Sequence, residues 1–547
     1  MAANGAADHS ALSYERGPNV PALLETTIGV NLAETASRHG QRHALVDAHA
    51  GRRWNYAEFL ADVRRLATGL VRAGIGVGDR VGIWAPNRWE WVLVQYATAE
   101  IGAILVTVNP AYRSIELRYA LRQSGVCMII AASGFKDADY RAILAEVAPD
   151  CPDLREAVFM DSDRWDELAG TQSDLAALQQ IASTLTGSDP VNIQYTSGTT
   201  GHPKGVTLSH RNILNNGYFV GELLDYTADD RICIPAPFYH CFGMVLGNLA
   251  ATSHGAAVVI PAPGFDPAAT LRAVQTERCT SLYGVPTMFI AELGLPDFTD
   301  YDLTSLRTGI MAGSTCPVEV MRMVIEQMHM PAISICYGMT ETSPVSTQTR
   351  TGDSLERRVG TVGRVGPHLE IKVVDPVTGE TVPRGVPGEF CTRGYSVMAG
   401  YWNDPERTAA VIDDDGWMHS GDLAAMDACG YVQITGRIKD IVIRGGENVS
   451  PREIEEFLHT HPDVVDAHVI GVPDERVGEE LMAVIKLRDG APQLTIARLH
   501  EFCADRIARF KIPRYVRIVD EFPMTVTGKV RKVELRQQAI DYLQGRG

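Results

Sequence analysis

The chain has 547 residues, which is too many for one hydrophobic core and predicts two or more domains. With 45% hydrophobic and 21% charged residues, its composition is that of a soluble globular protein. The formal net charge of −17 argues against nonspecific nucleic-acid binding and against attachment to an anionic membrane surface.

The remaining bulk features concern compartment and membrane. The ten cysteines form no C-x-x-C pair and no cluster at zinc spacing, which predicts reduced thiols in a cytosol-like compartment. There is no run of eighteen apolar residues, so no transmembrane helix is expected. The first residues lack the basic and apolar regions of a secretory signal, and residues 1–20 are expected to form a flexible tail. We therefore expect a cytoplasmic protein, of an oligomeric state that the sequence leaves open.

Predicted strands and helices alternate between residues 44 and 130. Strands are expected at 44–47, 81–84, 104–108 and 127–130, and helices at 57–73 and 89–101. The first helix carries one apolar face and stops at Gly74; its apolar positions are Leu60, Val63, Leu66, Ala67, Leu70 and Val71. Repeated β-α-β units predict parallel sheets covered by helices on both faces.

The alternation resumes with strands expected near 257–260, 306–310 and 333–336. Short strands separated by turns at 369–393 predict a β-rich subdomain. Further on, Ser450 to Glu453 is expected to open a helix with a capping box and proline at the first helical position. The expected fold class is thus α/β, with a flexible tail (1–20), a large domain (21–438) of helix-covered, mostly parallel sheets plus the β-rich subdomain, and a small mobile α+β domain (439–547).

The segment from Tyr195 to Gly205, YTSGTTGHPKG, is suited to holding a polyphosphate. Its glycines allow the backbone to approach an anion closely, its hydroxyls and amides can donate to phosphate oxygens, and Lys204 adds a positive charge. The spacing differs from that of the G-x-x-x-x-G-K-[ST] nucleotide loop, because Pro203 precedes the lysine and Gly205 follows it.

Five further motifs follow in order: YGMTET at 337–342, GWMHSGD at 416–422, GRIKD at 436–440, GGENVSP at 445–451 and PMTVTGK at 523–529. Together with the phosphate loop they resemble the acyl-adenylate-forming superfamily, which includes acyl-CoA synthetases, nonribosomal adenylation domains and luciferases. The resemblance spans nearly the whole chain, from about residue 56 to Lys529. It implies attack of a carboxylate on the α-phosphate of Mg-ATP, giving acyl-AMP and pyrophosphate, followed by attack of a thiol on the acyl carbon.

The resemblance also implies roles for individual residues in binding ATP. Glu341 would bind Mg²⁺, Thr340 would touch the α-phosphate, and Lys529 would be the catalytic lysine that bridges the attacking carboxylate and the α-phosphate. Asp422 would accept hydrogen bonds from the ribose hydroxyls, with Arg437 in support. Adenine would lie against Tyr337 and the segment 312–314. The full set expected to bind ATP or AMP is Thr196, Ser197, Gly198, Thr199, Thr200, Gly201, His202, Pro203, Lys204, Gly313, Ser314, Tyr337, Asp422, Arg437 and Lys529.

The acyl and CoA sites are expected elsewhere in the chain. Residues 237–240 and 283–287 would flank the acyl group, whose pocket would include His240, Tyr283, Gly284 and Gly338. His240 either gates the acyl and thiol channels or is a packed core residue. Because these segments contain no charged partner for an amino-acid head group, an apolar acyl chain is favoured. Gly445 and Gly446 would line a channel for CoA, and Lys439 would be the hinge of the small domain.

These features predict an acyl-CoA synthetase that converts ATP, CoA and a medium- to long-chain fatty acid to acyl-CoA, AMP and pyrophosphate. The segment 337–347 resembles the medium-chain branch in particular. Two alternatives share the scaffold: a CoA ligase for aryl or other carboxylic acids, and a fatty acyl-AMP ligase that loads a carrier protein. A catalytically silent adenylate-binding protein is a third, which the presence of Glu341, Asp422, Arg437 and Lys529 disfavours.

Overall fold

The computed structural model describes residues 11–196, 203–314, 316–444, 447–474, 476–504, 506–525 and 529–545. The chain divides into two compact units that interleave along the sequence. Unit 1 contains residues 1–14, 372–391 and 419–547, and unit 2 contains residues 15–371 and 392–418. The boundary predicted near Lys439 falls inside unit 1 and stays a prediction.

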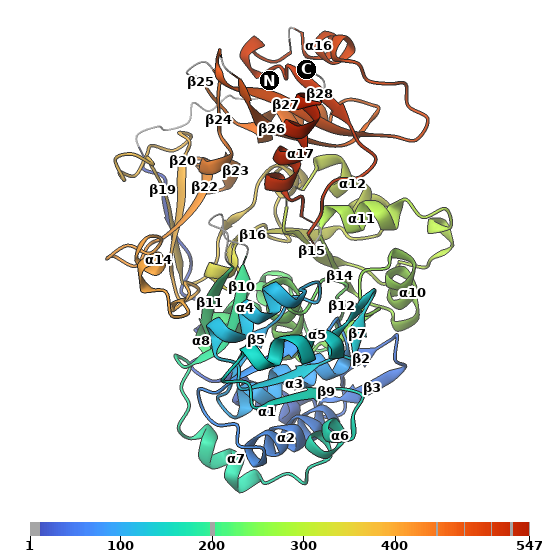
Figure 1. Cartoon of the computed structure of the whole chain (residues 1–547), viewed down its shortest axis with the longest axis vertical. Coiled ribbons are helices and arrows are strands. Elements are labelled where there is room, and N and C mark those ends of the chain that lie inside the picture. The colour runs from blue at the N-terminus through green and yellow to red at the C-terminus, as the bar shows by residue number, and fades with distance from the viewer. Residues whose placement is uncertain are drawn as a thin grey trace. The chain divides into compact units, whose positions relative to one another are not determined.

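Two large sheets form the centre of unit 2, and most of their strands are parallel, as predicted (Figure 1). The nine-stranded sheet contains, in spatial order, β18 (Arg364–Val365), β17 (Val345–Gln348), β16 (Ala332–Gly338), β15 (Thr308–Ala312), β14 (Ser281–Gly284), β12 (Arg231–Cys233), β13 (Ala257–Ile260), β2 (His43–Asp47) and β3 (Arg52–Asn55). The seven-stranded sheet contains β21 (Gly400–Tyr401), β11 (Lys204–Ser209), β10 (Pro190–Thr196), β5 (Ile104–Thr107), β4 (Arg80–Trp84), β6 (Met128–Ala131) and β9 (Glu156–Phe159).

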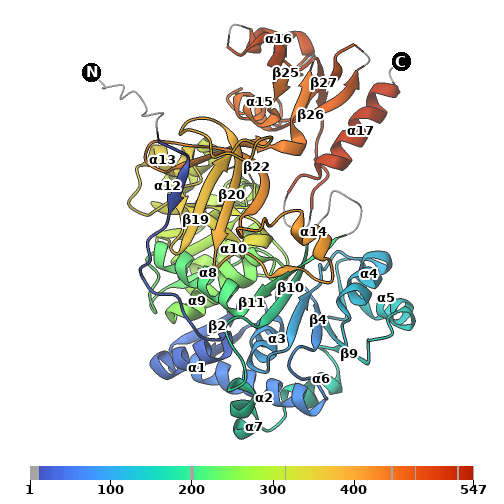
Figure 2. The ribbon, with the colours of Figure 1, turned by 90° about the vertical axis from the view of Figure 1, so that its left-hand side faces the viewer.

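Helices of unit 2 surround these sheets, and α1, α2, α6 and α7 gather at one end in both ribbon views (Figure 2). The α-helices are α1 (Ile28–His39), α2 (Tyr56–Arg72), α3 (Trp89–Glu100), α4 (Ser114–Ser124), α5 (Tyr140–Val147), α6 (Asp163–Ala169), α7 (Leu175–Ala182), α8 (His210–Leu223), α9 (Ala250–His254), α10 (Pro267–Glu277), α11 (Pro286–Leu293), α12 (Val318–Gln327), α13 (Leu355–Gly360) and α14 (Pro405–Ala409). Shorter elements are the two-stranded β7 (Gly134–Phe135) and β8 (Ala138–Asp139), the 3-10 turns η1 (Ala148–Asp150), η3 (Phe298–Asp300) and η4 (Thr340–Thr342), and the π-helix η2 (Phe242–Leu249).

The burial of helices α2 and α3 explains the apolar patterns from which both helices were predicted. The apolar face of α2 is buried, and Asn55 begins the helix with a capping box to Glu58. By contrast α3 is buried on nearly all sides, because it contacts β4 and β5 of one sheet and β2 of the other. A helix in that position needs apolar residues all round, and the predicted buried helix is confirmed.

A third sheet has the order β1 (Tyr14–Arg16), β19 (Leu369–Val374), β20 (Gly388–Gly394), β22 (Met418–Met426) and β23 (Val432–Arg437). Strands β19, β20 and β22 run side by side, as Figure 2 shows. The predicted β-rich segment at 369–393 is therefore confirmed. The strand expected at 306–310 is real but begins two residues later, at Thr308.

The C-terminal part of unit 1 is α+β, as predicted. Its sheet has the order β25 (Glu447–Val449), β24 (Val442–Arg444), β27 (Gly478–Leu487) and β26 (Val464–Asp474), and β28 (Tyr515–Ile518) pairs with β27. The helices are α15 (Pro451–Leu458), α16 (Ile496–Cys503) and α17 (Lys532–Gln544), with 3-10 turns η5 (Ile438–Asp440) and η6 (Arg509–Lys511).

The capping box predicted for the helix at Pro451 is wrong in one respect. Ser450 is the N-cap residue and Pro451 is the first helical residue, but the Ser450 side chain makes no capping hydrogen bond. Its hydroxyl donates instead to the carbonyl of Thr435 on β23, at 2.6 Å. The expected partner, Glu453, forms an ion pair with Lys511. Contacts from outside the helix thus outcompete the local motif.

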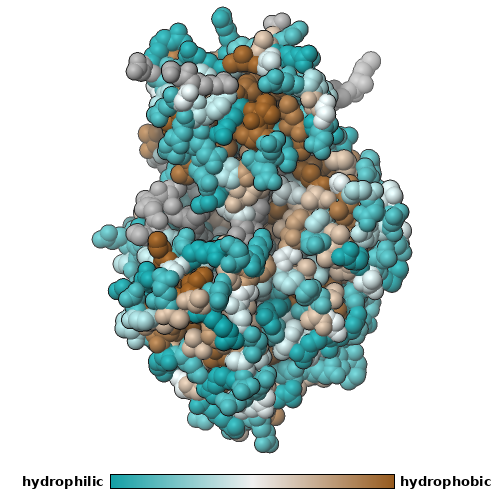
Figure 3. Space-filling model, turned by 45° about the vertical axis from the view of Figure 1, so that its right-hand side comes forward, coloured by the Kyte–Doolittle hydropathy of each residue, from teal (hydrophilic) through white to brown (hydrophobic). Residues whose placement is uncertain are grey.

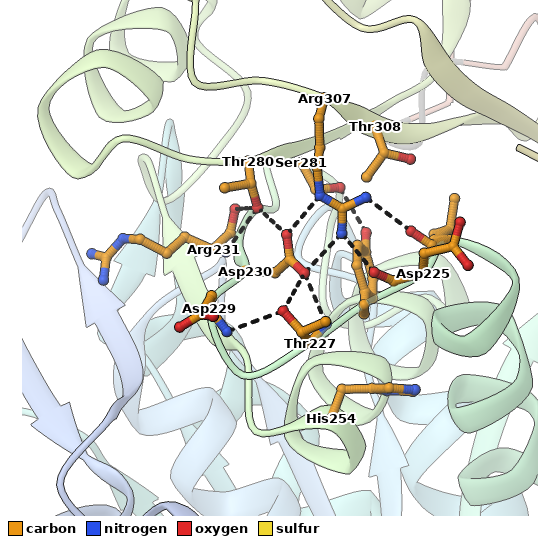
Figure 4. A network of polar contacts seen from close by, with 12 residues as sticks. Asp225, Thr227, Asp229, Asp230, Arg231, His254, Thr280, Ser281, Arg307 and Thr308 are labelled. Carbon is orange, nitrogen blue, oxygen red and sulfur yellow. Dashed lines mark hydrogen bonds and ion pairs between the residues drawn. The ribbon is translucent and has the colours of Figure 1, made fainter.

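A polar network around the buried Asp230 joins the N-terminal ends of three parallel strands (Figure 4). The Asp230 carboxylate, just before β12, accepts from Arg307 Nη2 at 2.8 Å and from Thr280 Oγ1 at 2.6 Å. Thr280 and Arg307 precede β14 and β15 in the same sheet. Burial alone would raise the pKa of Asp230, but the hydrogen bonds from Arg307 and Thr280 outweigh it and lower that pKa.

Hydrophilic residues cover most of the face shown in Figure 3. Among the described residues, no helix is long and apolar enough to cross a membrane.

Candidate functional site

The predicted phosphate loop connects two adjacent antiparallel strands of unit 2. Thr196, the last residue of β10, lies opposite Lys204, the first residue of β11. The carbonyl of Pro203 accepts a hydrogen bond from Tyr119 Oη at 3.1 Å, which ties the loop's end to α4. The loop residues between these ends fall outside the described part of the chain; they are Ser197, Gly198, Thr199, Thr200, Gly201 and His202.

Tyr401, which the motifs did not single out, connects Lys204 and Glu341. These two residues are the ones predicted to bind phosphate and metal. The Lys204 ammonium lies 3.4 Å from Tyr401 Oη and 4.7 Å from the centre of the Tyr401 ring. The same phenol donates to Glu341 Oε1 at 2.9 Å. Tyr401 and Glu341 are both buried, and Tyr401 lines an open cavity of about 720 Å³. A cation, a hydroxyl and a carboxylate therefore lie in sequence, and of these three residues Tyr401 lines the cavity.

The loop that carries Glu341 is held by hydrogen bonds within the loop itself. It follows β16 and forms the single turn η4, in which Thr340 is buried beside Glu341. Thr342 Oγ1 accepts from the backbone N–H of Met339 at 3.1 Å and donates to the carbonyl of Pro344 at 2.9 Å. The Glu341 carboxylate is therefore presented from a backbone with its own hydrogen bonds.

The residues predicted to contact adenine lie at one edge of the nine-stranded sheet. Strands β15 and β16 are parallel, and Ala312 pairs with Cys336. Gly313, with φ of +91°, and Ser314 follow β15, while Tyr337 is the next-to-last residue of β16. Neighbouring carboxyl ends of parallel strands are where ligands bind in α/β sheets. The position of these residues thus agrees with ligand binding at this edge.

The predicted acyl-pocket residues Tyr283 and Gly284 end the next strand of the same sheet, β14, where Gly284 pairs with Met311. Tyr283 is fully buried, and its hydroxyl accepts from Tyr226 Oη at 2.9 Å. A side chain at Gly284 would meet the Phe289 ring at 3.0 Å, so there is little free space at this Cα.

Gly338 has a different explanation from the one predicted. A Cβ at this position would lie 1.8 Å from the carbonyl oxygen of Pro344. The glycine is therefore required by the close approach of its own loop, and it does not by itself indicate space for an acyl chain. A share of Gly338 in the acyl pocket stays a prediction.

His240 precedes the π-helix η2, an element type that is common at functional sites. The ring is half-buried, and its Nδ1 lies 3.1 Å from the backbone N–H of Phe242, from which it accepts a hydrogen bond. That bond fixes Nδ1 as the acceptor. A half-buried ring is compatible with both roles predicted for His240, the gating of the acyl and thiol channels and packing in the core.

In unit 1, Asp422 and Arg437 lie opposite each other on β22 and β23. Asp422 Oδ1 is 2.8 Å from Arg437 Nε, and the aspartate is buried whereas the arginine side chain is 63% exposed. Glu389, which sequence reasoning missed, holds the start of β22 just before Asp422. Glu389 accepts from the Gly421 N–H at 3.0 Å and lies 2.9 Å from His419 Nδ1.

The other predicted residues of unit 1 lie in its C-terminal part. Lys529 is half-buried, and its N–H donates to Thr525 Oγ1 at 2.9 Å while its carbonyl accepts from the Thr525 N–H at 2.7 Å. The predicted hinge residue Lys439 lies in the turn η5. Gly445 and Gly446 lie outside the described residues.

Comparison with known proteins assigns most of the chain. The model of the AMP-binding enzyme family matches residues 32–402, and that of the AMP-binding enzyme C-terminal domain matches residues 453–529. The chain is 50% identical to "Putative acyl-CoA synthetase YngI" of Bacillus subtilis, over 95% of this chain and 98% of that one. It is 44% identical to the mitochondrial medium-chain acyl-CoA ligase ACSF2 of Danio rerio, over 96% of this chain and 90% of that one.

Among solved structures, the anthranilate CoA ligase AuaEII in complex with anthranoyl-AMP is similar, with a TM-score of 0.85 and 26% identity. The match covers 94% of this chain and 98% of the ligase.

Proposed function

The chain belongs to the AMP-binding enzyme family, and from that premise we propose that it is an acyl-CoA synthetase for medium- to long-chain fatty acids. ATP, CoA and the fatty acid are converted to acyl-CoA, AMP and pyrophosphate. The observation that carries this proposal is the 50% identity, over 95% of the chain, to a relative named as a putative acyl-CoA synthetase. The cytoplasmic location expected from the sequence stays a prediction.

Residues of unit 2 would serve the phosphates. The Lys204 ammonium would neutralise charge on the β- and γ-phosphates, together with the hydroxyls and amides of the loop that starts at Thr196. Thr340 would contact the α-phosphate from the turn η4. These groups favour adenylation because negative charge gathers at the α-phosphate as the fatty-acid carboxylate attacks.

The surroundings of Glu341 suit Mg²⁺. This ion is usually bound by one or two carboxylates together with substrate phosphates and waters. Glu341 supplies one buried carboxylate, and since a carboxylate has about four acceptor sites, the hydrogen bond from Tyr401 leaves capacity for a metal. Mg²⁺ bound there would neutralise charge on ATP.

Residues of unit 1 would serve the ribose and the reacting carboxylate. Asp422 would accept from the ribose hydroxyls while Arg437 holds it by the ion pair at 2.8 Å. Lys529 would bridge the fatty-acid carboxylate and the α-phosphate during adenylation. For the thiol step we propose a rotation of residues 439–547 at Lys439, which would replace Lys529 by the CoA channel of Gly445 and Gly446.

The acyl chain is proposed to lie beside β14, near Tyr283 and His240. The name of one relative, a medium-chain acyl-CoA ligase, favours an acid of medium length. A ligase for aromatic acids is the second candidate, because the similar solved structure is an anthranilate ligase, although at lower identity. A carrier protein in place of CoA is the third alternative.

The proposed activity predicts that AMP release will depend on both CoA and a fatty acid. A panel of straight-chain acids of increasing length, with benzoate and anthranilate for comparison, distinguishes the candidates. We expect the highest kcat/KM for a medium- or long-chain acid. Higher kcat/KM for the aromatic acids, or acyl-AMP formation that CoA fails to discharge, would contradict this assignment.

We expect Glu341→Gln, which keeps the shape of the side chain and removes its charge, to raise the Mg²⁺ concentration needed for half-maximal exchange of pyrophosphate into ATP. The reason is that a neutral amide oxygen is a weaker ligand for Mg²⁺ than a carboxylate. A matched control is Glu406→Gln on α14, an exposed glutamate of the same unit. An unchanged Mg²⁺ dependence in the first variant would remove Glu341 from the metal site.

A further inference from the structure

Tyr401 is held on both sides by backbone hydrogen bonds of its own segment, residues 398–402. The Met398 N–H donates to the carbonyl of Glu341 at 2.9 Å, and the Trp402 N–H donates to the carbonyl of Gly205 at 2.7 Å. The Tyr401 N–H donates to Thr408 Oγ1 at 2.9 Å. The segment is therefore a strap between the loop of Glu341 and the strand that begins with Lys204.

The Tyr401 hydroxyl makes two polar contacts with different roles. It accepts from the Lys204 ammonium at 3.4 Å and donates its proton to Glu341 Oε1 at 2.9 Å. A phenol with the ordinary pKa of about 10 keeps its proton at neutral pH, so the Tyr401 hydroxyl is the donor toward Glu341.

The Tyr401 hydroxyl oxygen lies between two opposite charges that are both proposed to bind the ligand. Lys204 and Glu341 are separated by only two hydrogen-bond lengths, through one oxygen atom. Without that oxygen the ammonium and the carboxylate are attracted into a direct ion pair. Such a pair would have to break before Lys204 could hold a phosphate and Glu341 a metal ion.

On the basis of the function proposed above, we propose that Tyr401 is a positioning residue, which orients the Glu341 carboxylate for Mg²⁺ and keeps it apart from Lys204. It does so by its hydroxyl, while its ring supports the lysine from the side at 4.7 Å. Tyr401 itself transfers no proton and forms no bond to substrate.

Tyr401→Phe tests this, because it keeps the ring and removes only the hydroxyl. ATP binding is titrated in the absence of any acid at a series of Mg²⁺ concentrations, and followed by the rise in melting temperature. We expect the Mg²⁺ concentration for half-maximal stabilisation to rise about tenfold, the usual effect of losing a hydrogen bond to a charged group. Pyrophosphate exchange should show the same shift.

Two further variants separate this role from a merely structural one. Tyr140→Phe removes another buried phenol hydroxyl, which donates to the carbonyl of Pro110 at 2.6 Å, and should leave the Mg²⁺ dependence unchanged. In a Glu341→Gln background, Tyr401→Phe should cause no further rise. Thr408→Val removes the acceptor of the Tyr401 N–H and should also raise the Mg²⁺ concentration for half-maximal stabilisation, but by less. This variant replaces Tyr401→Phe in the test if Tyr401→Phe folds poorly.

An unchanged Mg²⁺ dependence in both Tyr401→Phe and Thr408→Val would overturn the proposal. An equal rise with and without the Glu341 carboxylate would also overturn it. The binding of Mg-ATP is measured without an acid, so it does not depend on the proposed function. If the protein binds Mg-ATP but activates no fatty acid, the proposed function is refuted and the role of Tyr401 is not.

Discussion

Lys529→Ala is expected to lower the rate of adenylation by roughly 10²–10³, as removal of one transition-state contact typically does. The lysine would stabilise charge on the fatty-acid carboxylate and the α-phosphate only while these react. The variant should therefore still convert supplied acyl-AMP and CoA to acyl-CoA. Acid-dependent exchange of pyrophosphate into ATP measures the first half-reaction, and acyl-CoA formed from synthetic acyl-AMP measures the second.

A suitable control for Lys529→Ala is Lys511→Ala. Lys511 lies in the same unit and forms an ion pair with Glu453, a glutamate with a largely exposed side chain. Loss of such a pair should change neither half-reaction. If Lys529→Ala slowed both half-reactions to the same degree, its proposed role in adenylation alone would be wrong.

Arg307→Met is expected to destabilise unit 2 by about 3 kcal/mol, because it leaves the buried Asp230 carboxylate without its cation. The Asp230 side chain is 4% exposed, and only the bonds from Thr280 and Thr227 would remain. Urea unfolding followed by tryptophan fluorescence measures the change. The exposed pair of Arg278 and Asp302 supplies the control, since Arg278→Met should cost under about 0.5 kcal/mol.

The same variant should have a characteristic pH dependence. In the wild type the pKa of Asp230 lies below its unfolded value, so its stabilising contribution is complete above the unfolded pKa and is lost as pH falls through the folded pKa. Without Arg307, burial dominates and raises the pKa of Asp230. Protonation of Asp230 then removes the cost of burying its unpaired charge. The stability difference between wild type and Arg307→Met should therefore shrink between neutral pH and about pH 4. A constant difference over this range would contradict the role assigned to Asp230.

The sequence alone determined those features whose physical cause lies within a short stretch of chain. The apolar face of α2 and the all-round apolar α3 follow from helical periodicity, and Pro451 begins α15 because proline suits the first helical turn. The motifs around Lys204 and Glu341 were likewise recognisable, because each is contiguous. The α/β class followed from the order of these local elements.

Only the tertiary structure decided which distant residues meet. Tyr401 lies sixty positions after Glu341 and carries no local signal for its contact, which arises because β21 pairs with β11 and turns the phenol toward η4. Ser450 failed as a capping residue because the carbonyl of Thr435, on another element, competes for its hydroxyl. Gly338, in turn, is needed because Pro344 returns onto the same loop. Hydrogen bonds and close approaches of this kind depend on how elements pack, and a pattern read along one segment contains no information about its partners.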